Sequence, residues 1–319
     1  MKKIIHLVST AVVAASVTAT PLLMTQAQAA DYPNRPVKFV VPWPAGDLED
    51  ILTRMVAEDM AKETGKPASV VNKPGGAGVV GAADVSRARA DGLTIGSFVA
   101  DILTTHVLAG NAPFNEETFE PVGIFLDYPF VIATKADAPY NTMGELAEYS
   151  QNNAVSLGHF GYQALPTAIT FKAADKIGIK FSSDAPFDSN DCSTLANGDA
   201  DVINTTTQQI IACLKSGDVK LLSAITRDRL TIAPEVPTLN EQTGVSQTTW
   251  NGLFVKQGTS PEIKARIAEI AAKTMASDRA QELAKTTGAG VFWIAGADAE
   301  QVVSDDYDAA QDLLDFMKQ

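Results

Sequence analysis

Cysteine, histidine and positive charge are all scarce in this chain of 319 residues. It has two cysteines, Cys192 and Cys213, and beyond the first 30 residues its only histidines are His106 and His159. Two thiols without neighbouring histidines make a poor zinc site. A serine hydrolase of the Gly-x-Ser-x-Gly type is disfavoured because the chain lacks that motif. We therefore expect no metal, no cofactor and no catalytic residue.

Acidic residues outnumber basic ones, with 38 Asp and Glu against 25 Lys and Arg and a formal net charge of −13. Loss of Lys2 and Lys3 with a cleaved N-terminal leader would make this −15. Such a surface repels nucleic acid and anionic lipid headgroups. No window of 18 apolar residues occurs after residue 30. We therefore expect a soluble exported chain that does not bind nucleic acid.

The first 29 residues have the pattern of a secretory signal peptide. Lys2 and Lys3 precede an apolar run over residues 4–24, and Ala27-Gln-Ala29 supplies the small residues of a cleavage site. The alternative is an uncleaved anchor helix, but threonine, serine and proline interrupt the run and no stop-transfer charges follow. We expect cleavage after Ala29 and a periplasmic location.

An oxidising periplasm favours a bridge between Cys192 and Cys213. It would close a loop of about 22 residues and stabilise the fold by roughly 3 kcal/mol in the chain-entropy model. Two buried free thiols are the alternative.

Strand-like and helix-like runs alternate along the chain, which predicts an α/β fold with largely parallel sheets. The middle third holds a complete set of its own. We therefore expect lobe I from residues 30–130 and 250–319 and lobe II from residues 131–249, joined by two crossing strands that can act as hinges. The predicted strands are 37–41, 69–72, 93–97, 130–134, 155–157, 202–204, 221–226 and 250–255. The predicted helices are 47–64, 78–87, 142–152, 166–178, 208–216, 261–277 and 297–317.

The most informative stretch is the first predicted strand–turn–helix unit, residues 37–64. A Pro/Gly turn over 42–46 joins the strand to a helix in which Leu48, Leu52 and Val56 recur at helical spacing. A helix that begins just after a strand directs its free N–H groups and the positive end of its dipole to the space above the sheet. Open α/β sheets bind small ligands there, so this unit predicts half of a binding site.

Several motifs follow one another along the chain: Pro42-Trp-Pro-Ala-Gly46 with Asp50 and Arg54, Val71-Asn-Lys-Pro-Gly-Gly-Ala-Gly78, Ala90-Asp-Gly-Leu-Thr94, Phe119-Glu-Pro-Val-Gly123, Asn197-Gly-Asp-Ala-Asp-Val202, Pro234-Glu-Val-Pro-Thr238 and Trp250-Asn-Gly-Leu253. In this order they resemble the Bug family, the periplasmic solute receptors of tripartite tricarboxylate transporters. The resemblance implies a type II periplasmic binding protein fold whose two lobes close on one small ligand, most often an organic acid. It also implies delivery to a permease with large and small subunits. We expect a monomer.

In the family a carboxylate is usually held by backbone N–H groups and ordered water from two loops, which correspond here to residues 43–47 and 158–162. The resulting ligand-binding candidates are Trp43, Ala45, Gly46, Asp47, Asp101, His159, Phe160, Tyr162, Asp188, Thr205 and Thr206. Three of them depart from the family pattern: Asp47 replaces a glycine, Asp188 replaces a lysine, and Asp101 replaces a small polar residue. These acids favour a second hypothesis, a cationic, zwitterionic or polyhydroxylated ligand.

Several candidates have structural alternatives. Asp50 is interpreted as a structural cap of the first loop and Glu49 as a solvated residue, while Asp47 either contacts ligand or N-caps the helix. Residues 76–81 fit a dinucleotide fingerprint, but a lone fingerprint is weak evidence, and we interpret Gly76 and Gly78 as structural. Trp43 can brace its turn, and Thr205 and Thr206 can cap a helix. An exported hydrolase or the receptor of a sensor kinase remains an alternative function.

Overall fold

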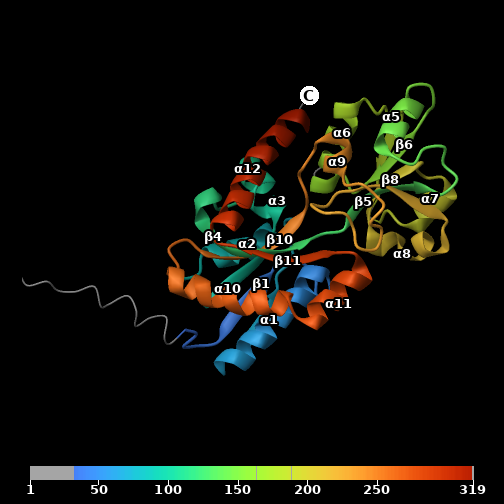
Figure 1. Cartoon of the computed structure of the whole chain (residues 1–319). Coiled ribbons are helices and arrows are strands. Elements are labelled where there is room, and N and C mark those ends of the chain that lie inside the picture. Colours follow the sequence, from blue (N-terminus) through green and yellow to red (C-terminus); the bar gives the residue numbers. More distant parts are fainter. Residues whose placement is uncertain (1–31, 163, 188, 318–319) are drawn as a thin grey trace, which may run out of the picture.

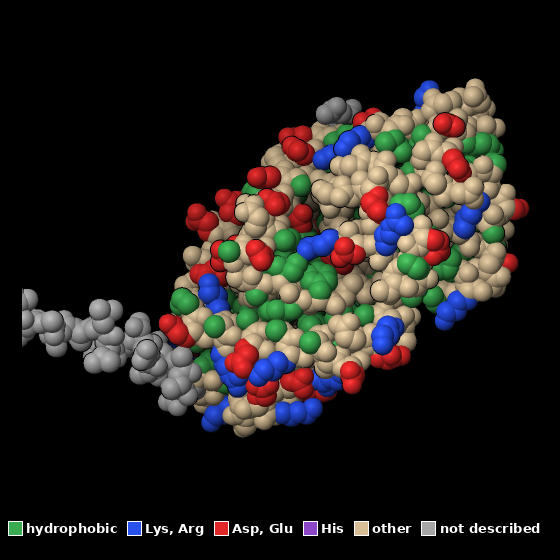
Figure 2. All heavy atoms as spheres, viewed as in Figure 1, with side chains coloured by type: hydrophobic (Ala, Val, Ile, Leu, Met, Phe, Trp, Pro, Cys, Tyr) green, Lys and Arg blue, Asp and Glu red, His purple; other side chains and the backbone are tan. Residues whose placement is uncertain are grey.

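The computed structural model describes residues 32–162, 164–187 and 189–317, which form two α/β units side by side (Figure 1). Among these residues, none of the helices combines the length and the hydrophobicity that a membrane crossing requires. The predicted signal peptide, its cleavage after Ala29 and the candidate Asp188 lie outside the described residues. Acidic and basic side chains are interspersed over the face seen in Figure 2, so the excess negative charge is not gathered into one patch there.

The first unit is built on a mixed sheet whose described strands follow the order β11-β4-β10-β3-β1-β2. The strands are β1 (Val37–Val41), β2 (Ala68–Asn72), β3 (Thr94–Val99), β4 (Phe119–Asp127), β10 (Trp250–Lys256) and β11 (Gly290–Ala295). β1 pairs in parallel with β2 and β3, whereas β10 runs antiparallel to β3 and β4. The prediction of largely parallel sheets is therefore wrong for β10 and β11, which run antiparallel to their neighbours, and for the strand 130–135 of the second sheet, which does the same.

Helices of the first unit pack on both faces of that sheet. They are α1 (Leu48–Thr64), α2 (Val79–Ser86), α3 (Ala100–Leu103), α4 (Thr105–Leu108), α10 (Pro261–Met275), α11 (Asp278–Thr287) and α12 (Ala297–Met317), with a 3-10 turn, η1 (Glu116–Thr118). Leu52, Val56 and Met60 of α1 are fully buried against β1 and α10. α1 ends where Gly65 adopts a left-handed conformation, with φ 67°.

The second unit has a sheet whose described strands follow the order β7-β6-β8-β5-β9. Its strands are β5 (Phe130–Lys135), β6 (Ser156–His159), β7 (Ser183–Pro186), β8 (Val202–Thr206) and β9 (Val219–Ala224). Its helices are α5 (Met143–Ser150), α6 (Leu165–Ile177), α7 (Cys192–Asn197), α8 (Thr207–Ser216) and α9 (Leu239–Thr243). A disulfide between Cys192 and Cys213 joins α7 to α8 with the Cα atoms 5.9 Å apart, which confirms the predicted bridge.

The chain passes between the units at two adjacent points. β4 leads into β5 through Tyr128 and Pro129. The chain returns to the first unit at Thr249, directly before β10. The Tyr128 N–H donates to the Thr249 carbonyl oxygen at 2.8 Å, so the two crossing segments lie side by side. Because every strand from β5 to β9 belongs to the second sheet, we propose lobe boundaries at 130/131 and 249/250.

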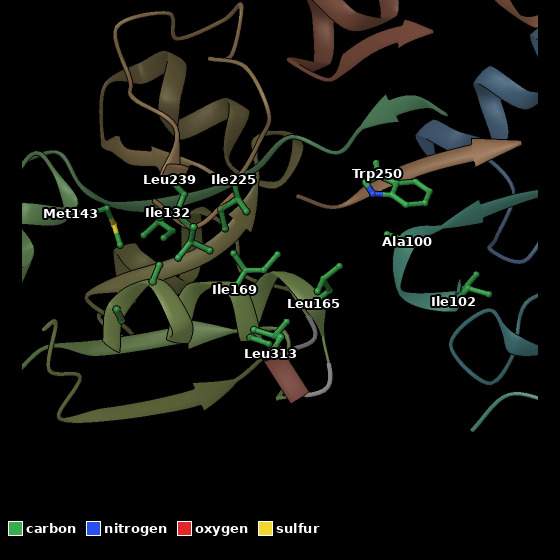
Figure 3. Packing of buried hydrophobic residues seen from close by; sticks show 14 of the residues in the cluster. Ala100, Ile102, Ile132, Met143, Leu165, Ile169, Ile225, Leu239, Trp250 and Leu313 are labelled. Atoms are coloured by element: carbon green, nitrogen blue, oxygen red, sulfur yellow. The ribbon is translucent and has the colours of Figure 1, made fainter. Parts of the chain in front are cut away.

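One apolar cluster extends from the first unit into the second. Trp250 and Ala100 belong to it on one side, and Ile132 and Ile169 on the other (Figure 3). The last helix, α12, contributes Leu313, which lies beside α6 of the second unit. α12 therefore packs against both units.

Candidate functional site

A pocket of about 510 Å³ lies where the carboxyl ends of strands from both sheets meet the two crossing segments. Open α/β sheets bind ligands at this edge. Both units and both crossings contribute to its wall. The lining residues are Trp43, Asp47, Leu48, Glu49, Val99, Asp101, Tyr128, Phe130, Phe160, Ala164, Leu165, Pro166, Thr206, Gln208, Gln209 and Thr249.

Asp50, which is 1% exposed, stabilises the loop between β1 and α1. Its carboxylate accepts hydrogen bonds from the Gly46 N–H at 2.9 Å, from Asn72 at 2.8 Å and from two nitrogens of Arg54 at 2.9 Å each. Burial opposes ionisation, but these donors outweigh it and lower the pKa of Asp50. Asn72 also donates to the Trp43 carbonyl oxygen at 3.0 Å. These are the contacts that the loop-organising role predicted for Asp50 requires.

Asp47 and Glu49 extend the first loop into the pocket wall. Asp47 occupies the N-cap position of α1, but its side chain makes no capping hydrogen bond. Burial, with the nearby charge of Asp50, raises the pKa of Asp47. Glu49 is only 2% exposed, so its interpretation as a solvated residue is wrong. It follows the same helix face as Leu52 and Thr53, a periodicity that could have identified it.

Glu49 contacts the first crossing segment. Its Oε2 accepts a hydrogen bond from the Tyr128 hydroxyl at 2.8 Å. Burial raises the pKa of Glu49 to about 7, although the Tyr128 hydroxyl acts against the shift. Burial also raises the pKa of Tyr128. The carboxyl group of Glu49 therefore titrates near neutral pH, and it lies in the pocket wall beside the first crossing segment.

Three polar side-chain atoms in the pocket wall are buried and make no hydrogen bond to any described residue. They are Trp43 Nε1, Asp101 Oδ1 and Thr249 Oγ1. Burial raises the pKa of Asp101, with His106 acting against the shift. Buried polar atoms are almost always paired in folded proteins. The three unpaired atoms are therefore available to form hydrogen bonds with a molecule in the pocket.

Phe160 and Thr206 of the second unit line the pocket, whereas Thr205 does not. Phe130 and Thr206 are opposite each other in the β5–β8 pair and both line the pocket, while Thr205 pairs with Val131 on the other face. Thr205 is fully buried, and its hydroxyl donates to the Asn190 carbonyl oxygen. The Thr206 hydroxyl caps α8 by accepting from the Gln209 N–H at 3.4 Å.

His159 and Tyr162 support the second loop rather than the pocket wall. The fully buried His159 accepts the Gly161 N–H at Nδ1 over 2.9 Å, and its Nε2 lies 3.0 Å from Asp184 Oδ1. With Nδ1 as the acceptor of the Gly161 N–H, Nε2 is placed to donate to Asp184. Tyr162 is 54% exposed, and its hydroxyl donates to the same carboxylate. Neither residue is among those that line the pocket, and the ligand contacts expected of both stay a prediction.

The remaining candidates belong to the framework. Ala45 and Gly46 are exposed in the loop outside the pocket wall, and the Gly46 N–H is already bonded to Asp50. Gly78 has φ 90°, and a Cβ there would lie 2.4 Å from the Ile102 side chain, so the residue must be glycine for steric reasons. Gly76 lies in the same turn, with φ 56°. Both fit their structural interpretation.

Sequence reasoning missed the lining residues at the two crossings, Tyr128, Phe130 and Thr249. The predicted crossings near residues 130 and 250 were a usable signal, because hinge segments of a two-lobed protein border its cleft. It also missed Gln208, Gln209 and residues 164–166, which follow β8 and β6. Within the described ranges, no group of three or more His, Cys, Asp or Glu side chains is arranged to hold a metal ion.

Comparison with known proteins gives a consistent result. A family model described as "Tripartite tricarboxylate transporter family receptor" matches residues 52–317. The chain is 30% identical over 279 residues to a UPF0065 protein from the gbd 5' region of Cupriavidus necator, covering 85% of this chain and 84% of that protein.

Two solved structures have the same fold and similar sequences. A TctC solute-binding protein from Polaromonas, solved without ligand, matches with a TM-score of 0.78 and 28% identity over 89% of this chain and 99% of that one. The periplasmic binding protein BugD matches with a TM-score of 0.65 and 28% identity over 90% and 98%. The chain belongs to the receptor family of the tripartite tricarboxylate transporters, whose members are periplasmic solute-binding proteins rather than enzymes.

Proposed function

We propose that this protein captures a small organic solute in the pocket between its two units and delivers it to a tripartite membrane permease with large and small subunits. The observation that carries the proposal is the shared wall: Asp47 and Asp101 come from the first unit, and Phe160 and Thr206 from the second. A ligand that contacts both units binds their closed arrangement best and so shifts the population toward it. A permease can then distinguish the loaded receptor from the empty one.

The ligand class has two candidates. A carboxylic acid is supported by the family resemblance and by two proteins of the same fold, one solved with malate at 22% identity and one with adipate at 21% identity. Those ligands belong to those proteins and enter here only as a candidate class. A cationic ligand is supported by the acids of this pocket, Asp47, Glu49 and Asp101.

Filling the pocket tests its role in binding. Ala164 lines the pocket at the N-cap of α6 and is partly exposed, so Ala164→Trp adds bulk to the pocket without filling a core. The matched control is Ala136→Trp, at an exposed turn outside the wall. We expect the molecule that co-purifies with the periplasmic protein, detected by native mass spectrometry, to be lost only from the Ala164→Trp variant. Retention in both variants would show that the solute binds elsewhere.

Delivery to a permease needs a cellular measurement. We expect deletion of this protein to abolish uptake of the co-purified solute, and we expect the unaltered chain or Ala136→Trp, but not Ala164→Trp, to restore it. Uptake that continues in the deletion strain would support the alternative role as the receptor of a sensor kinase. We also propose that the receptor works as a monomer, which size-exclusion chromatography with light scattering can measure.

A further inference from the structure

We infer that the pocket binds an organic cation: an ammonium group surrounded by Asp47, Glu49 and Asp101, carried on an apolar body that lies against Tyr128, Phe130 and Phe160. The inference rests on the proposed function, because it names the ligand class of the same pocket.

The charges of the wall favour a cation. Three carboxyl groups line the pocket, and no Lys, Arg or His is among its described lining residues. Arg54 does not line the pocket, and its Nε and Nη2 donate to Asp50 and Asn72. Burial raises the pKa of all three acids, and an ammonium group in the pocket would favour their ionised forms, whereas a bound carboxylate would oppose their ionisation.

Three backbone N–H groups of the two loops are already paired. In the first loop the Gly46 N–H donates to Asp50 at 2.9 Å. In the second loop the Phe160 N–H donates to the Thr167 hydroxyl at 3.2 Å, and the Gly161 N–H donates to His159 at 2.9 Å. The resemblance assigns carboxylate binding to N–H groups of these two loops. An anion bound by these three groups would have to displace existing hydrogen bonds.

Two of the unpaired atoms in the wall are acceptors that an ammonium group can satisfy. Asp101 Oδ1 and Thr249 Oγ1 are buried and have no donor among the described residues, and Thr249 as a whole is only 5% exposed. An ammonium group carries up to three N–H donors and no acceptor. Trp43 Nε1 is an unpaired donor, so it fits a hydroxyl or carbonyl oxygen elsewhere on the ligand.

Aromatic rings form a continuous apolar wall next to the acids. The Tyr128 and Phe130 ring centroids are 6.3 Å apart, and those of Phe130 and Phe160 are 5.9 Å apart, the latter edge to face. Such rings bind apolar groups and attract cations through their π faces. The volume of about 510 Å³ is in the usual range for small-ligand pockets. The wall is therefore suited to an alkyl or aromatic body with a charged end.

A series of compounds that differ only in charge tests this. Butyl, cyclohexylmethyl and 2-phenylethyl bodies are each used as the ammonium, the alcohol and the carboxylate, and binding to the purified full-length mature protein is measured by isothermal titration calorimetry. We expect the ammonium compound of at least one body to bind about tenfold or more tightly than its alcohol and carboxylate, the effect of one charge-assisted hydrogen bond.

Isosteric variants connect that preference to the wall. Asp47→Asn and Asp101→Asn should each weaken binding of the preferred ammonium compound by about tenfold. Asp137→Asn makes the same charge change at an exposed position outside the pocket and should leave the affinity unchanged. Thermal unfolding of each variant checks that it is folded.

The inference is overturned if a carboxylate is the tightest binder, if no member of the series binds, or if Asp101→Asn leaves ammonium binding unchanged. The co-purified molecule separates this failure from failure of the proposed function. An anion that is lost in Ala164→Trp would refute the cation while supporting the receptor. Absence of any pocket-bound molecule would count against both.

Discussion

Replacing Glu49 with glutamine should stabilise the protein at alkaline pH and leave its stability nearly unchanged at acidic pH. Glutamine keeps the shape of the protonated acid and an oxygen that can accept the Tyr128 hydroxyl. Burial raises the pKa of Glu49 from 4.5 to about 7. The folded protein therefore retains a proton that the unfolded chain releases at lower pH.

The sign and size follow from that shift. Protonation of Glu49 contributes stability that is fully present below pH 4.5, its unfolded pKa, and is lost as the pH rises through about 7, its folded pKa. A difference of roughly 2.5 pKa units corresponds to about 3 kcal/mol. The side chain is nearly inaccessible to solvent, so solvent screening reduces this little. Glu49→Gln should therefore exceed the unaltered protein by up to about 3 kcal/mol at pH 8 and by little at pH 4.5.

Urea unfolding at half-unit steps from pH 4.5 to pH 8.5 measures the difference. The matched control is Glu148→Gln on the exposed side of α5, for which we expect no pH-dependent gain. A difference between Glu49→Gln and the unaltered protein that stays constant across this range would refute the idea that Glu49 ionises with a raised pKa in the folded state.

Other substitutions test the framework of the pocket. Asp50→Ala should lower the free energy of unfolding by about 3 kcal/mol, because it leaves the Gly46 N–H, Arg54 and Asn72 without their shared acceptor; chemical denaturation checks this, and a loss below 1 kcal/mol would contradict it. The double variant Cys192→Ser/Cys213→Ser should lower that free energy by roughly 3 kcal/mol, since the bridge spans a separation of 21 residues; equal urea midpoints under oxidising conditions would contradict it. Thr249→Val removes an unpaired buried hydroxyl, so it should raise the stability of the ligand-free protein by up to about 1 kcal/mol and weaken ligand binding; calorimetry that shows unchanged affinity would exclude a contact between this hydroxyl and ligand.

Local sequence patterns were sufficient for elements whose signal is strong and continuous. The first strand was predicted with the boundaries observed for β1, and the helix that follows it begins within one residue of α1. β4 was missed because Pro121 interrupts it, although it lies between two other strands. The sheet accommodates the proline at a register shift between Leu253 and Phe254 of β10. That compensation comes from the partner strand, so the local sequence does not reveal it.

The candidate site was harder to predict because its geometry depends on which way each side chain points. A strand directs successive residues to opposite faces, and the sequence did not determine whether Thr205 or Thr206 would face the pocket. His159 looked like a ligand contact, but its partner Asp184 comes from a neighbouring strand 25 residues further along the chain. Asp47, Asp101 and Trp43 could be identified beforehand because they follow strand ends.

The position of α12 has a consequence for the motion of the receptor. This helix starts in the first unit, where Asp306 accepts a hydrogen bond from the Trp250 indole, and near its end Leu313 lies beside α6 of the second unit. Any rotation that separates the units must therefore slide α12 along α6 or expose Leu313 to water. Removing the end of α12, with Leu313, should therefore lower the free-energy cost of separating the two units.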